Sequence, residues 1–441
     1  MSRALPQVRR RRGWRAAAIA AAALLAACVA LVAVLNRWAE APLPADDGPP
    51  PTAAAPQAVA RGEYLARAGN CMACHTDVGG VPFAGGRGIE TPFGTVYSTN
   101  LTPDAATGLG DWSAAAFWRA LHHGRSRDGR LLYPAFPYPS YTHVTREDSD
   151  AIYAYLRSLP PVRQPARPHA LEFPYGTQAA LAVWRALFFR PGGLEPEPGR
   201  PAEWNRGRYL VQGLGHCAAC HSPRNALGAT QDAGALRGGL IPVQNWYAPA
   251  LDTVHEAGVA DWPAEEVVAL LRDGATPRAT VTGPMAEVVF RSTQYLDGAD
   301  LRAMAAYLQA LPGTSAAAAG RAPRPEPPRA SMERGAAVYT QHCAQCHGDG
   351  GDGRPGAFPA LAGNRAVLLD TPVNLVRTIL QGGYAPVTPG NPRPHGMPPF
   401  TQVLGDEDVA AVATFVRNAW GNQAPGVATI DVYRARERRG R

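Results

Sequence analysis

Six of the seven cysteines occur in one pattern, Cys-x-x-Cys-His, which appears three times along the chain. Two thiols three residues apart lie on one turn of helix, so both can form thioethers with the vinyl groups of a haem while the next histidine binds its iron. A zinc site needs four ligands, usually from two neighbouring cysteine pairs, whereas these pairs lie more than 120 residues apart. The sequence therefore predicts three covalently bound haems c. Their thioether cysteines are Cys71, Cys74, Cys217, Cys220, Cys343 and Cys346, and their proximal histidines are His75, His221 and His347.

Methionine opposite histidine is the usual ligand pair of an electron-carrying haem, and the chain has only six methionines. Two of them, Met285 and Met397, lie in predicted loops after the second and third motifs, shortly before an amphipathic helix. We therefore predict Met285 and Met397 as the sixth ligands of the second and third haems. A core methionine is the alternative at each position.

The first motif has no methionine at the matching place, where the chain has Phe136. Phenylalanine cannot bind iron, so this haem either takes another ligand or stays open. The nearest candidate is His143, and His122 and His123 on a predicted helix are weaker ones. Neutral imidazole is a good iron ligand, and a second histidine would set the potential of this haem below those of the other two. A surface histidine and an open iron remain the alternatives.

The motifs belong to longer repeats. An Arg-Gly pair precedes each motif, and amphipathic helices are predicted over 148–159, 300–311 and 406–420. We therefore expect an all-α fold of three tandem cytochrome c-like haem domains after an N-terminal membrane anchor. The predicted segments are a basic region and anchor (1–38), a tether (39–58), domain 1 (59–165), an interdomain segment (166–200), domain 2 (201–313), a linker (314–330), domain 3 (331–424) and a basic tail (425–441).

A basic N-terminus precedes an unbroken run of 20 apolar residues from Ala16 to Leu35. Such a run can cross a bilayer as a helix, and the basic flank keeps its own side cytoplasmic. We expect a retained anchor in the inner membrane, with the haem domains facing the periplasm. A cleaved secretory signal and a lipoprotein lipidated at Cys28 are the alternatives. The Pro- and Ala-rich stretch 39–58 cannot form a packed core and reads as a tether.

The stretch 173–190 is apolar on most sides. It is interpreted as an interdomain packing helix, or alternatively as a surface that meets a partner subunit or the membrane.

The formal charge of +7 is concentrated at the two ends of the chain, and the central part is slightly negative. A nucleic-acid-binding protein would carry its basic residues on a folded face, so nucleic acid is excluded as a partner.

Over nearly its whole length the chain resembles the triheme cytochrome c subunit of membrane-bound bacterial dehydrogenases. The resemblance implies a partner subunit that oxidises an alcohol, sugar, sugar acid, aldehyde or N-heterocycle, and transfer of its electrons to membrane quinone or a terminal oxidase. It also implies the proximal histidines and distal methionines named above, and a methionine where this chain has Phe136. The matching stretches are TPFGTVYSTNLTP (91–103), GLGDW (108–112), GPMAEVV (283–289), STQYL (292–296) and VRNAWGN (416–422).

No nucleotide-binding glycine loop or pair of catalytic carboxylates is recognisable in the chain. We therefore expect an electron-transfer subunit with no catalytic site of its own. The alternatives are a haem enzyme or gas-binding protein that acts at an open first haem, and a stand-alone cytochrome that links quinol to an oxidase.

Overall fold

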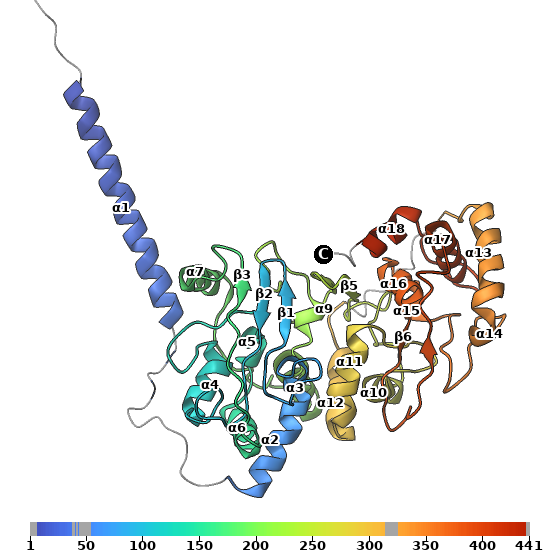
Figure 1. The fold of residues 1–441 in the computed structure, drawn as a ribbon, viewed down its shortest axis with the longest axis horizontal. Helices are drawn as coiled ribbons and strands as arrows, with labels where there is room; N and C mark the ends of the chain where they lie inside the picture. Colours follow the sequence, from blue (N-terminus) through green and yellow to red (C-terminus); the bar gives the residue numbers. More distant parts are fainter. Residues whose placement is uncertain (1–6, 38–39, 41–42, 44–53, 314–324, 438–441) are drawn as a thin grey trace, which may run out of the picture.

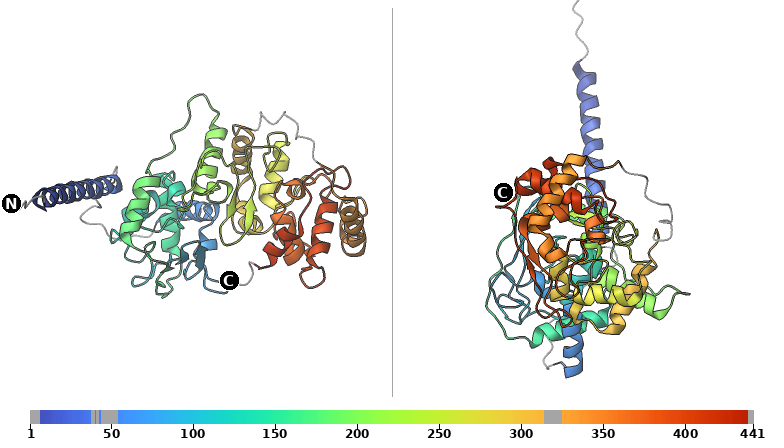
Figure 2. Two further views of the ribbon diagram at one scale, coloured as in Figure 1. Left: turned by 90° about the horizontal axis from the view of Figure 1, so that it is seen from above. Right: turned by 90° about the vertical axis from the view of Figure 1, so that its right-hand side faces the viewer.

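In the computed structural model, residues 7–37, 40, 43, 54–313 and 325–437 are described. One long helix, α1 (Gln7–Arg37), projects from an elongated body (Figure 1). Its part from Trp14 to Arg37 is long and apolar enough to cross a membrane. Seen from above, the body is a row of parts that follow the order of the sequence away from α1 (Figure 2).

Three pairs of crossing helices organise the body, each made by a helix before a Cys-x-x-Cys-His motif and a helix that follows it. We call the segments α2–α6, α8–α12 and α13–α18 the first, second and third units. The closing helices predicted over 148–159, 300–311 and 406–420 are confirmed, with ends shifted by up to four residues. The pairs are α2 (Pro56–Ala68) with α6 (Arg146–Ser158), α8 (Ala202–Arg208) with α12 (Gly298–Gln309), and α13 (Arg329–His342) with α17 (Asp406–Val416).

A glycine lets the two backbones of each pair touch, because any side chain there would collide with a carbonyl group of the closing helix. A methyl group on this glycine would come within 1.9 Å of a carbonyl oxygen in the first two units, and within 2.3 Å in the third. The repeated Arg-Gly of the sequence thus marks the helix crossing, and each motif begins eight to ten residues later. The glycine and carbonyl residues are Gly62 and Ala151, Gly207 and Ala303, and Gly335 and Ala411.

The motifs form short helical turns, and further helices fill the space between the crossing pairs. The motif turns are α3 (Cys71–Cys74), α9 (Ala218–His221) and α14 (Ala344–His347). The other helices are α4 (Ala114–His123), α5 (Tyr138–Tyr141), α7 (Gln178–Phe188), the π-helix η1 (Tyr209–Leu214), α10 (Ala264–Asp273), α11 (Pro284–Arg291), the 3₁₀-helix η2 (Thr293–Tyr295), α15 (Arg365–Leu368), α16 (Val373–Gln381) and α18 (Thr429–Glu437).

Each unit also carries a small antiparallel sheet, which the expectation of an all-α fold did not include. In the first unit the sheet gains a strand from the interdomain segment, because Ala170 pairs with Thr95. The strands are β1 (Gly88–Thr91), β2 (Gly94–Tyr97) and β3 (Ala170–Leu171), then β4 (Gly239–Ile241) with β5 (Trp246–Ala248), and β6 (Gly383–Tyr384) with β7 (Gly396–Met397).

The first and second units share one hydrophobic core, whereas the third unit has its own. The third unit contacts the second through polar groups. The side-chain amide of Asn374 donates to the backbone carbonyl oxygen of Tyr247 at 2.7 Å and accepts from its backbone N–H at 2.9 Å, and Arg365 lies 2.5 Å from Asp261. Since burial of apolar surface dominates stability, the first two units form one cooperative body.

The segments expected to be irregular are partly ordered. Most of the tether 39–58 and of the linker 314–330 lies outside the described residues, but α2 begins at Pro56 and α13 at Arg329. The expected basic tail contains α18, whose Val432 is fully buried against the third core. Arg436 ties this helix to Asp406 at 2.5 Å.

Replacing Gly207 by alanine should destabilise the joint body of the first two units. The added methyl group meets the Ala303 carbonyl oxygen, so the helices must separate, and overpacking of this kind costs roughly 1–3 kcal/mol. Urea unfolding of the holoprotein, followed by haem absorbance, measures the loss. Gly193→Ala is the control, because a methyl group there meets no atom within 4 Å. Equal midpoints for the two variants would contradict the helix-crossing role.

Candidate haem-binding sites

The three motif histidines make the same hydrogen bond. Each Nδ1 lies close to a backbone carbonyl oxygen of its own unit, so Nδ1 carries the proton and Nε2 keeps its lone pair for a metal. Burial lowers the pKa of each imidazole against this hydrogen bond, which keeps the ring neutral. The pairs are His75 with Thr99 (2.7 Å), His221 with Pro249 (2.7 Å) and His347 with Pro359 (2.9 Å).

An arginine side chain donates a hydrogen bond to the backbone of each motif. In all three units a guanidinium donates to the carbonyl of the residue just before the second cysteine of the motif. The arginines stand at different distances after the motif histidine, so the sequence repeat does not reveal them. The pairs are Arg87 with Ala73 (2.7 Å), Arg224 with Ala219 (2.5 Å) and Arg354 with Gln345 (3.2 Å).

Five of the six motif cysteines are partly buried, and Cys74 is exposed. Burial raises the pKa of Cys71 and of Cys217 to about 12, and that of Cys343 to about 11. Burial also raises the pKa of Cys74, and the positive charge of Arg87 opposes this rise. Gly69 lies beside both the Cys71 thiol and Leu214 of η1, so the first motif is close to the second unit. Within the part of the chain that the structure describes, no cluster of three or more His, Cys, Asp or Glu side chains offers a metal-ion site. Each motif supplies two thiols and one imidazole, which fits covalent haem, whereas a structural zinc site uses four ligands.

The two methionines predicted as sixth ligands lie beside the cores of their units. Met285 is in the first turn of α11 and packs, partly buried, against the core shared by the first two units. Met397 is in β7, packs against the core of the third unit and borders an open pocket of about 510 Å³ that Tyr384 and Pro398 also line.

The first unit differs from the other two at the place predicted for the sixth ligand. Phe136 packs against the shared core, and its ring centroid lies 5.4 Å from that of Tyr141. His143 lies beside Gly213 of η1, and its Nδ1 is 2.9 Å from the carbonyl oxygen of Gly192, which leaves Nε2 for another contact. His143 therefore sits where the first unit meets the second. His122 stacks on Trp118 with ring centroids 4.3 Å apart.

The first two units hold each other by reciprocal hydrogen bonds. Tyr64 of the first unit donates to Asp300 of the second at 2.7 Å, and Tyr209 of the second donates to Asp148 of the first at 2.6 Å. Each aspartate lies in the first turn of a closing helix and is also paired with an arginine of its own unit. These ion pairs are Arg61 with Asp148 and Arg206 with Asp300.

The carboxylates at this contact are almost fully buried, at 2% exposure for Asp148 and 7% for Asp300. Burial alone would raise the pKa of Asp300, but hydrogen bonds from Arg206 and Tyr64 hold it below its ordinary value. Each tyrosine hydroxyl also accepts the backbone N–H of the helix N-cap residue, Asp297 or Thr145, at 3.3 Å. Hydrogen bonds to buried charges are among the stronger ones, so this contact fixes the spacing of the first two motifs.

Sequence reasoning missed the carbonyl acceptors, the supporting arginines and the reciprocal Tyr–Asp contact. The tyrosines are visible in the repeat Arg-Gly-x-Tyr-Leu at Tyr64 and Tyr209, and a first-turn aspartate recurs in both closing helices. A tyrosine stands two residues after the glycine in the first two units, whereas the third unit has Ala337 there. This difference is the signal that could have indicated a contact between the first two units.

Comparison with known proteins gives one consistent family. The family model for cytochrome c matches residues 59–160, 205–312 and 332–420. The cytochrome c subunit of a quinone-dependent alcohol dehydrogenase from Gluconacetobacter polyoxogenes is 39% identical over 396 residues, which are 86% of this chain and 84% of that protein. The gluconate 2-dehydrogenase cytochrome c subunit of Pantoea cypripedii is 38% identical over 84% of this chain and 87% of its own. The fructose dehydrogenase cytochrome subunit of Gluconobacter japonicus is 34% identical over 88% and 84%.

Tyr64→Phe and Tyr209→Phe should each destabilise the joint body by about 1.5 kcal/mol. This value is the lower end for a hydrogen bond to a charged group, because an arginine still pairs with each aspartate in the variants. Urea unfolding of the holoprotein measures the loss. For Tyr64→Phe the deficit is full above the ordinary aspartate pKa of about 3.9 and fades as the pH falls through the lower pKa of Asp300. Tyr384→Phe, at a side chain 76% exposed, is the control. Similar stability of all three variants would exclude the reciprocal contact.

Proposed function

Because the chain belongs to the family of cytochrome c subunits of membrane-bound dehydrogenases, it carries covalently bound haem c and transfers electrons, and we propose that it does so through three such haems. The observation that carries the number is the threefold recurrence of a half-buried motif imidazole whose Nδ1 is bonded to a backbone carbonyl. Each bound haem would accept and release one electron, and the chain itself supplies no catalytic site.

The protein residues have three roles in this proposal. The six motif cysteines would hold the haems, and the backbone carbonyl at each histidine orients the imidazole toward iron and raises its basicity. Met285 and Met397 would be the sixth ligands of the second and third haems, where a thioether stabilises reduced iron and raises the potential. The haem units correspond to domain 1 (59–165), domain 2 (201–313) and domain 3 (331–424), in tandem and with helical cores.

The route of electrons follows from how the units meet. The first two units are neighbours held by a shared core and the reciprocal Tyr–Asp contact, so the first two haems would form a closely spaced pair. The third unit packs on the second through polar contacts. It therefore provides the next haem along the chain, at the end farthest from α1 (Figure 2).

The helix α1 would anchor the chain in the inner membrane. Its length and apolar composition support a span, and the arginines before it favour a cytoplasmic N-terminus, which leaves the haem units in the periplasm. The names of the relatives support a dehydrogenase subunit as the electron donor. Membrane quinone or a terminal oxidase would be the acceptor.

Purified holoprotein should contain three haems per chain by the pyridine haemochrome assay, and redox titration should resolve three one-electron steps. Deleting the gene in its host should abolish substrate-dependent oxygen uptake in membranes and preserve dehydrogenase activity with an artificial acceptor. Two haems or fewer in fully matured protein would contradict the triheme proposal. Loss of activity with the artificial acceptor as well would contradict the role of a pure electron carrier.

The sixth ligand of the first haem is a separate question, and we propose His143. Its ring is half-buried, and burial lowers its pKa although the hydrogen bond to Gly192 opposes this, so the imidazole is neutral and can bind iron. An open iron is the competing outcome, because His143 also packs against the second unit.

Reduced wild-type protein should bind no CO, and His143→Ala should gain one CO-reactive, high-spin haem. His122→Ala is the control, since that ring stacks on Trp118 and should leave the haem spectrum unchanged. CO binding by one haem of the wild type would show that His143 is not a ligand and that the first iron is open.

A further inference from the structure

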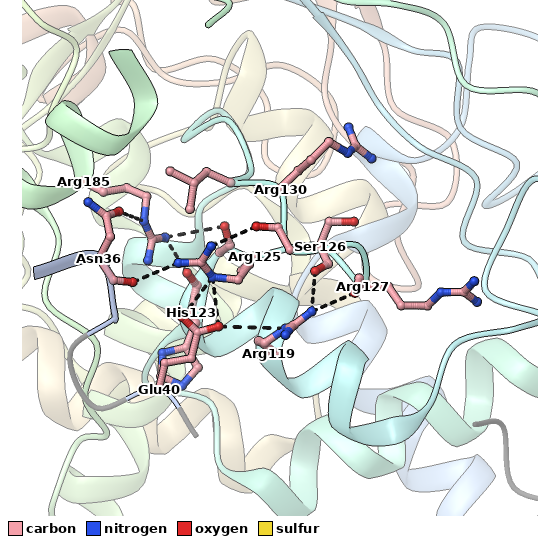
Figure 3. A network of polar contacts seen from close by, with 12 residues as sticks. Asn36, Glu40, Arg119, His123, Arg125, Ser126, Arg127, Arg130 and Arg185 are labelled. Atoms are coloured by element: carbon pink, nitrogen blue, oxygen red, sulfur yellow. Dashed lines mark hydrogen bonds and ion pairs between the residues drawn. The ribbon is translucent and has the colours of Figure 1, made fainter. Parts of the chain in front are cut away.

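The end of α1 is bonded to the first unit through a buried polar network (Figure 3). Asn36, next to the last residue of α1, is only 8% exposed. Its side-chain amide donates to the carbonyl oxygen of Ala182 in α7 at 2.8 Å, and its Oδ1 accepts from Nε of Arg185 at 3.0 Å. Arg185 is 4% exposed and also donates to the carbonyl oxygen of His123. A polar side chain at the end of an apolar helix is thus used to attach that helix to α4 and α7.

A second set of contacts closes the network around Glu40. Arg125 donates to the carboxylate of Glu40 at 2.9 Å and to the backbone carbonyl oxygen of Asn36 at 2.9 Å, and Arg119 lies 3.9 Å from the same carboxylate. Removing one partner from such a buried group would leave a charge unpaired, so the network resists rearrangement. These contacts therefore fix the direction of α1 relative to the first unit.

The helix α7 lies beside the last turns of α1 (Figure 1). Its outer face carries exposed apolar side chains. Its inner side buries Leu181, Arg185 and Phe189, whereas Val183 and Leu187, one helical turn apart, are 48% and 60% exposed. Phe173, in the turn before α7, is 88% exposed. The segment 173–190 contains two arginines and no acidic residue.

The position of the exposed face of α7 relative to α1 indicates which surroundings this face contacts. The span from Trp14 to Arg37 has 24 residues, which at about 1.5 Å per residue exceeds the roughly 30 Å of a bilayer core, so its last turn lies at the membrane boundary. Ala182 of α7 is bonded to Asn36 in that last turn. The exposed side chains of α7 are therefore at the depth of the lipid head groups, where an exposed apolar helix face without acidic residues is stable.

We propose that α7 is an interfacial membrane helix, with Phe173, Val183 and Leu187 inserted among the lipids that surround α1. The proposal rests on the proposed membrane span of α1. Together, α1 and α7 would give the first unit two membrane contacts joined by the Asn36–Arg185 network, and so hold the first haem at a fixed orientation and height above the bilayer.

The test uses the full-length holoprotein, alone, in liposomes of phosphatidylethanolamine and phosphatidylglycerol, treated with a membrane-impermeant maleimide. Cys28, the cysteine outside the motifs, reports whether α1 is in the bilayer. In a Cys28→Ala background, Leu187→Cys reports α7. Val403→Cys is the matched control, because Val403 is also 60% exposed and belongs to the third unit, far from α1. Haem content verifies that each variant folds, and Phe173→Cys replaces Leu187→Cys if the latter loses haem.

We expect no labelling of Cys28, and labelling of Leu187→Cys at least tenfold slower than that of Val403→Cys. Equal rates at 187 and 403 with Cys28 protected would overturn the assignment of α7 and leave the anchor intact. Labelling of Cys28 would overturn the anchor itself. Equal rates in liposomes combined with slow labelling of 187 in native membranes would show that a protein covers this face, and would also overturn the proposal.

Discussion

The close contact of two helix backbones at a glycine is the constraint on which each unit depends. At Gly62, Gly207 and Gly335 the helix before the motif touches a carbonyl of the closing helix, so the distance between the two axes is fixed by backbone atoms and not by adaptable side chains. The motif begins eight to ten residues later, so its cysteines and histidine lie at a limited distance from the helix crossing. The carbonyl of Thr99, Pro249 or Pro359 then fixes the rotation and tautomer of the imidazole.

The first two units are joined differently from the second and third, so the molecule consists of one joined pair and one separate unit. The first two share a core and exchange hydrogen bonds to buried carboxylates, whereas the third has a separate core and polar contacts. A closely held pair would keep the distance between the first two proposed haems constant, which a rapid electron step between them requires. The third unit, with Arg365 and Asn374 at its boundary, can adjust its position at less cost, as interfaces between domains commonly do.

Features determined by short stretches of sequence were predictable, and features determined by distant partners were not. The Cys-x-x-Cys-His motif indicates haem attachment within five residues. The closing helices can be predicted from their apolar period without knowledge of the fold. Arg87, Arg224 and Arg354 perform one role from different distances along the chain, so no spacing reveals them. The small sheets are too short for a periodic signal, and the contact of Asn36 with Arg185 joins residues 149 positions apart. The stretch 173–190 is apolar on most sides, which predicted a helix but not which side of it would remain uncovered.

The reciprocity of Tyr64 and Asp300 with Tyr209 and Asp148 has the geometry of an isologous dimer, in which the same patch of two copies binds itself about a twofold axis. In a true homodimer every substitution appears twice, so both halves must accept it. Joining the halves in one chain removes that restriction, and each half can change alone while the contact stays symmetric. The presence of Phe136 in the first unit, where the second has Met285, is an asymmetry that a fused pair can hold and a homodimer cannot.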